Sequence, residues 1–211
     1  MKKVMVCMMM VLLAGSTYAQ SDKFKQAMEI NIAALDAAKS PGDLQSAAAS
    51  FERIANAEKT QWLPFYYAAI ANIWRGFAAP NEEKDDIATQ AENLLAKAEA
   101  LDANNAEIFI AKNMTSTIHM IVDPQTRWQT YGGKGAQDLA MAKKLDVNNP
   151  RIYFLEGQGI FGMPEQFGGG KDKAKPLFEK SVALFDTYKP VNNLYPNWGK
   201  KNAADMLEKC K

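Results

Sequence analysis

Two segments of this sequence match each other without a gap at a spacing of 44 residues. The first is AEALDANNAEIFIAK, residues 98–112, and the second is AKKLDVNNPRIYFLE, residues 142–156. In both, a helical pattern ends at Leu-Asp-x-Asn-Asn, and a second one opens with isoleucine and an aromatic residue. A fixed period of this size is typical of helical repeats, in which each hairpin buries its apolar face against the next. Since alanine is frequent and strand patterns are scarce, we predict an all-α chain.

Small and large apolar residues also recur at fixed helical spacings. A small residue is followed by a large apolar residue four positions on and by a third residue three positions later, in three triplets: Ala47, Phe51 and Ile54; Ala91, Leu95 and Ala98; Ala174, Phe178 and Ser181. This pattern resembles the second helix of the tetratricopeptide repeat. The first helix of that repeat carries an aromatic residue and, four positions later, a small residue at a close helix crossing, as Tyr153 and Gly157 do here. The resemblance implies a right-handed array of helical hairpins, a TPR-like α-solenoid.

The predicted hairpins are longer than the standard repeat and form a single domain over residues 20–211. We place them at about 23–57, 62–102, 106–147 and 150–188, followed by a C-terminal closing helix at about 197–210. Residues 123–135 are expected to form a long loop. Phrases such as VDPQTRWQTYG and NNPRIYFLEGQ resemble those of secreted bacterial tetratricopeptide-type proteins of unassigned function. That resemblance implies a fold and a compartment, and no activity.

The N-terminus has the pattern of a secretory signal peptide. Lys2 and Lys3 precede an apolar run over residues 4–14, which is too short to span a membrane. Cleavage is expected after Ala19. The phrase LLAGS resembles a lipobox, but Ser16 stands where the lipid-bearing cysteine would be. We therefore expect a soluble periplasmic or secreted protein without membrane insertion after cleavage.

Charge and cysteine content narrow the classes of partner. The predicted signal peptide contains two lysines and no acidic residue, so cleavage changes the formal charge from +1 to −1. This balance gives no electrostatic reason to expect nucleic acid as a partner. The mature chain keeps one cysteine, Cys210, which cannot form an internal disulfide. We interpret it as a packed residue of the last helix, with an intermolecular bridge as the alternative.

The stretch PEQFGGGKDKAKPLFEK, residues 164–180, has the outward look of a phosphate-binding loop. A Walker motif requires a glycine at position 165 and a hydroxyl residue at position 172, where this chain has Glu165 and Asp172. We expect the three glycines, residues 168–170, to reverse the chain with positive φ angles. An anion site at the start of the next helix is the alternative.

No other pattern predicts catalysis or metal binding. The single histidine, His119, has no histidine or cysteine partner at ligand spacing, and no serine lies in a nucleophile elbow. We therefore expect a non-enzymatic protein without a cofactor or a metal.

The first helices of tetratricopeptide hairpins line a concave groove, and the resemblance gives candidate groove residues: Tyr66, Ile70, Trp74, Ile110, Met114, Phe154 and Gln158. Such an apolar groove is either open to a ligand or filled by the protein's own segments, namely the loop over 123–135 or the closing helix with Trp198. Arg127 and Trp128 are candidate loop contacts. The leading hypothesis is a scaffold that binds an unidentified protein or peptide in this groove. The alternative is a periplasmic carrier of a small apolar ligand.

Overall fold

The computed structural model describes residues 22–211, which form helices and connecting turns with no strand. The helix over residues 22–36 is followed by these elements: α2 (Pro41–Glu58), α3 (Trp62–Ala78), α4 (Asn81–Leu101), α5 (Ala106–Val122), α6 (Pro124–Arg127), the π-helix η1 (Trp128–Gly132), α7 (Gly133–Leu145), α8 (Pro150–Gly162), the 3-10 helix η2 (Glu165–Phe167), α9 (Lys171–Thr187) and α10 (Lys200–Glu208). The predicted all-α class is confirmed. The predicted signal peptide and its cleavage site lie outside the described residues.

The repeated Leu-Asp-x-Asn-Asn motif ends one helix and starts the next. Asp102 and Asp146 follow the last residues of α4 and α7 with nearly the same backbone angles. The second asparagine of each motif, Asn105 or Asn149, then accepts a hydrogen bond from a backbone N–H in the first turn of α5 or α8. A cap of this kind stabilises a helix by about 1 kcal/mol. The repeat therefore encodes a short turn with a defined helix start.

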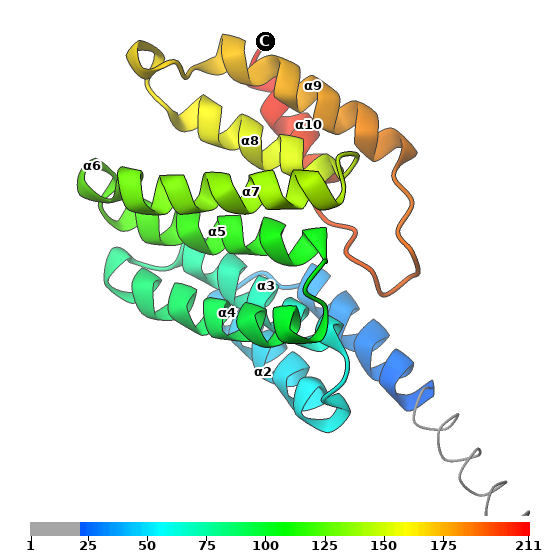
Figure 1. Ribbon diagram of the computed structural model, residues 1–211. Coiled ribbons are helices and arrows are strands. Elements are labelled where there is room, and N and C mark those ends of the chain that lie inside the picture. The colour runs from blue at the N-terminus through cyan, green and yellow to red at the C-terminus, as the bar shows by residue number, and fades with distance from the viewer. Residues whose placement is uncertain (1–21) are drawn as a thin grey trace, which may run out of the picture.

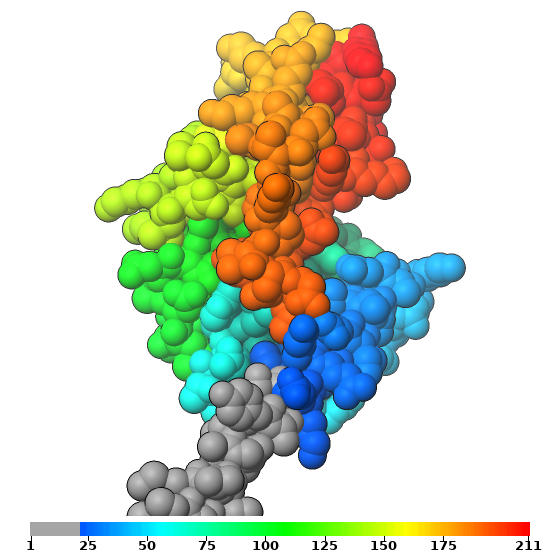
Figure 2. Space-filling view, turned by 90° about the vertical axis from the view of Figure 1, so that its right-hand side faces the viewer, coloured from blue at the N-terminus to red at the C-terminus, as the bar shows by residue number. Residues whose placement is uncertain are grey.

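Neighbouring helices pack as antiparallel pairs (Figure 1). Helix α3 packs against α2 and α4, α5 against α4 and α7, and α8 against α9. The turns that follow α3, α5 and α8 all lie at one edge of the array, on the left of Figure 1. The space-filling view shows the chain between α9 and α10 running back toward the helix over residues 22–36 (Figure 2).

The close crossing of α8 and α9 explains the small residue at position 157. A Cβ atom added to Gly157 would lie 2.6 Å from Cε1 of Phe178, a side chain that is fully buried. Real Cβ atoms do not approach other atoms so closely. The glycine therefore lets the two helices approach around the Phe178 ring.

Two features of the fold differ from the sequence expectation. The prediction of a loop over residues 123–135 is wrong, because these residues form α6, η1 and the start of α7. The closing helix starts at Lys200, later than predicted. Within residues 22–211, no helix combines the length and apolar character that crossing a bilayer requires.

Candidate functional site

The predicted groove residues lie mainly inside the protein. Trp74 is half-buried and Gln158 is exposed, whereas the other five are buried: Tyr66, Ile70, Ile110, Met114 and Phe154. The burial of these five residues fits the explanation that the protein fills this face itself, and Tyr66 accepts a hydrogen bond from Trp198.

The segment over residues 188–199, here called the strap, contacts the starts of α3 and α8. Trp198 donates a hydrogen bond from Nε1 to the hydroxyl of Tyr66 at 2.9 Å, and Tyr67 donates to the carbonyl of Leu194 at 2.9 Å. Trp62 meets Tyr195 edge to face, with ring centroids 5.7 Å apart. The strap is therefore part of the core and not a free loop.

A buried ion pair between α5 and α8 also contacts the strap. Arg151 Nη1 lies 3.0 Å from Oε1 of Glu107, and both side chains are fully buried. Arg151 Nη2 also donates to the carbonyl of Pro196 at 2.6 Å, and its guanidinium lies over the Trp198 ring. Burial raises the pKa of Glu107, although Arg151 opposes that shift. Breaking one partner of such a pair costs about 3 to 5 kcal/mol, so this network holds the strap in place.

A different surface carries exposed aromatic side chains. In residues 22–211, the two most exposed large aromatic side chains are Trp128, at 58%, and Phe167, at 71%. Met163 is 40% exposed and lies in the same turn as Phe167. We call Trp128, Met163 and Phe167 the aromatic rim. Single exposed apolar side chains are common on protein surfaces, whereas a group of them at one place often marks a binding site.

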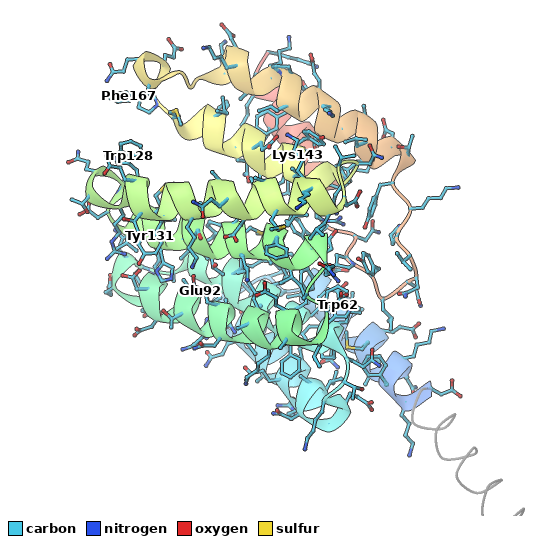
Figure 3. The ribbon with its side chains drawn as sticks, viewed as in Figure 1. Trp62, Glu92, Trp128, Tyr131, Lys143 and Phe167 are labelled. Atoms are coloured by element: carbon cyan, nitrogen blue, oxygen red, sulfur yellow. The ribbon has the colours of Figure 1, made fainter. Side chains whose placement is uncertain are left out.

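The fold brings the parts of the aromatic rim to one edge. Helices α7 and α8 have 13 residues each and are joined by a short turn. Because the two helices run in opposite directions (Figure 1), the start of α7 and the end of α8 lie at the same end. Trp128 precedes α7 on η1, and Met163 and Phe167 follow α8. Figure 3 shows Trp128 and Phe167 at this common edge.

A polar cluster anchors η1 beneath Trp128. Arg127 Nη1 donates to both carboxylate oxygens of Asp85, at 2.7 and 2.9 Å, and to the carbonyl of His119. His119 Nδ1 lies 2.6 Å from the same carboxylate, and its ring stacks on Tyr131 with centroids 4.8 Å apart. Partial burial raises the pKa of Asp85, but the hydrogen bonds from His119 and Arg127 outweigh it and lower the pKa below its usual value.

These contacts show that the two candidate loop residues, Arg127 and Trp128, have different roles. Arg127 is occupied by Asp85 and anchors the segment, whereas Trp128 lies largely in solvent. The π-helix itself is a second mark of a functional segment, because such helices occur often at functional sites. His119 is buried; its Nδ1 is engaged by Asp85, and its Nε2 lies 3.7 Å from Oε2 of Glu92.

The turn that carries Phe167 is closed by its own backbone. Gly169 N donates to the carbonyl of Pro164, and Gly170 N donates to that of Ile160. Gly168 and Gly170 have φ angles of 90° and 101°, which confirms the positive φ expected in this glycine run. A Cβ at Gly169 would lie 2.0 Å from the carbonyl oxygen of Met163. The glycines therefore form a compact turn that holds Phe167 outward.

The sequence reasoning named Trp128 but missed Met163 and Phe167. Their position could have indicated an exposed apolar surface, because both are large apolar residues in a glycine-rich turn and turns are usually polar. In residues 22–211, no group of three His, Cys, Asp or Glu side chains is placed to hold a metal ion.

The fold and these surfaces define a class: an all-α array of helical hairpins with a covered inner face and exposed aromatic side chains at one edge. No family model matches the sequence, and no curated protein matches it either. Among solved structures, the HusA haemophore from Porphyromonas gingivalis matches with a TM-score of 0.82 and 38% sequence identity. The match covers 89% of this chain and 92% of that chain. The chain therefore belongs to the same family as the HusA haemophore.

Proposed function

We propose that the protein is an exported, non-enzymatic carrier of haem or of a closely similar flat, apolar molecule. The observation that carries this proposal is the family relation, since 38% identity extends over nearly the whole of both chains. The relative is named a haemophore, a carrier of haem. The N-terminal sequence supports export, because it has the pattern of a secretory signal peptide.

The carrier alternative has better support than the peptide-binding scaffold. Five of the seven candidate groove residues are buried, and the strap contacts the aromatic residues at one end of this face. An extended peptide would need a continuous open groove there. A small ligand needs only a local apolar surface. The tetratricopeptide resemblance stays a prediction about the helical hairpins and does not by itself imply a peptide partner.

Titration of the mature protein with hemin, followed by Soret absorbance, tests the proposal. We expect a saturable complex of one hemin per chain with a dissociation constant of about 1 µM or below, equivalent to about −8 kcal/mol. The complex should survive gel filtration. Non-saturating absorbance together with elution of colourless protein would contradict the carrier function.

A further inference from the structure

We infer that the aromatic rim formed by Trp128, Met163 and Phe167 is the site that binds the flat face of the porphyrin. This inference rests on the proposed function, and it assigns the ligand to an edge of the helical array. The predicted inner groove is not the site.

The exposed side chains of the aromatic rim differ in chemistry from the other exposed apolar groups. In residues 22–211, the other large apolar side chains that are more than half exposed, Ile30, Val147 and Val191, are aliphatic, and Phe77 is aromatic but only 40% exposed. The aromatic rim combines an indole, a phenyl ring and a thioether. Aromatic rings stack on flat conjugated systems, and methionine sulfur makes favourable contacts with aromatic groups. A porphyrin macrocycle offers a flat, conjugated and apolar face of the kind that these side chains bind.

The segments that carry both rings are held in place before any ligand arrives. Trp128 lies on a π-helix tied to α4 and α5 through Arg127, Asp85 and His119. Phe167 lies in a turn closed by backbone hydrogen bonds. A surface that is already ordered loses less conformational entropy on binding than a flexible loop does. The exposure of these rings is therefore built into the fold.

The polar groups at the strap end of the inner face are already engaged within the protein. Tyr66, Tyr67 and Trp198 already donate or accept hydrogen bonds within the protein, and Arg151 is paired with Glu107. A porphyrin could enter there only by displacing the strap and exposing a buried ion pair, which is costly. Binding at the aromatic rim requires no such rearrangement.

The test compares hemin binding by the full mature chain and by the double variant Trp128→Ala, Phe167→Ala. Each lost stacking contact is expected to weaken binding about tenfold, and the pair about a hundredfold. The control is the double variant Ile30→Ala, Val191→Ala, which removes equally exposed apolar groups elsewhere and should bind as the parent does. Trp128→Phe keeps an aromatic face and should stay within about threefold of the parent.

The outcomes separate the two proposals. If the parent protein does not bind hemin, the carrier function is wrong. If the parent binds and the Trp128, Phe167 double variant binds equally well, the function stands and the aromatic rim is not the site. Circular dichroism and light scattering accompany each titration. A dimeric parent that becomes monomeric in the double variant would overturn the inference, because the aromatic rim would then be an interface between two copies.

Discussion

At the scale of single residues, Asp138 is the acidic group whose surroundings oppose its charge most clearly. Its Oδ2 atom is buried without a hydrogen-bond partner, and burial raises its pKa to about 6. Lys112 of α5 and Lys134 of α7 act against this shift, while Glu99 and Glu92 of α4 add to it. The two lysines are themselves paired with these two glutamates. The folded protein therefore holds a proton on Asp138 more tightly than the unfolded chain does.

This difference predicts how stability depends on pH. A carboxyl group with a raised folded pKa contributes stability below its unfolded value of 3.8, and that contribution is lost as the pH rises through about 6. Asp138→Asn should therefore be more stable than the parent at pH 7.5 by about 1 kcal/mol. We expect less than the ~1.4 kcal/mol per pKa unit of a fully buried group, because the carboxyl is only half-buried. The gain should vanish near pH 3.5.

Urea unfolding at the two pH values measures this change. Asp86→Asn, on the exposed face of α4, is the matched control and should show no comparable change in its effect with pH. A variant Asp138→Asn that is less stable than the parent at pH 7.5 would contradict the assignment.

At the scale of elements, the crossing of α8 and α9 depends on the absence of a side chain at position 157. Gly157→Ala improves helix propensity by about 1 kcal/mol, yet the added methyl group would overlap the ring of Phe178. Overpacking a core of this kind costs about 1 to 3 kcal/mol, so we expect net destabilisation. Gly159→Ala is the matched control, because no atom lies within 4 Å of a Cβ there. It should stabilise the protein by about 0.5 to 1 kcal/mol.

Chemical denaturation of the two variants and the parent at neutral pH gives the change in unfolding free energy for each substitution. The same substitution, made two positions apart on one helix, should change the unfolding free energy in opposite directions. Equal changes in unfolding free energy would show that α8 and α9 do not meet as closely as described.

The elements that the sequence predicted correctly are those specified by nearby residues. Asn105 and Asn149 cap helices within their own repeat, and the glycines at 168 and 170 adopt the positive φ angles expected of them. The π-helix η1 was predicted as a loop, because its anchor joins Arg127 to Asp85, 42 residues away. The residues next to Arg127 in the sequence do not indicate a contact with such a distant residue.

At the scale of the whole molecule, the strap links parts of the chain that are distant in sequence. Trp198 reaches Tyr66 across 132 residues, and Asn193 bonds to Glu29 across 164. Trp198 was expected to cover the inner face as part of the closing helix, whereas it lies in the strap. Five of the seven candidate groove residues are core residues, and Trp74 and Gln158 are not. The exposed aromatic groups lie instead at the edge where the turns meet (Figure 3).

The most direct measurement of the central claim is an NMR titration of the mature, ¹⁵N-labelled protein with a diamagnetic gallium porphyrin. The chain has four tryptophans, so four indole N–H signals report on four places at once. We predict that the Trp128 signal shifts most, together with backbone signals from residues 124–134 and 160–171. The Trp198 signal, hydrogen-bonded to Tyr66, should stay in place. Shifts centred on Trp198 and Trp74 would place the ligand on the inner face, and an unchanged spectrum would contradict the carrier function itself.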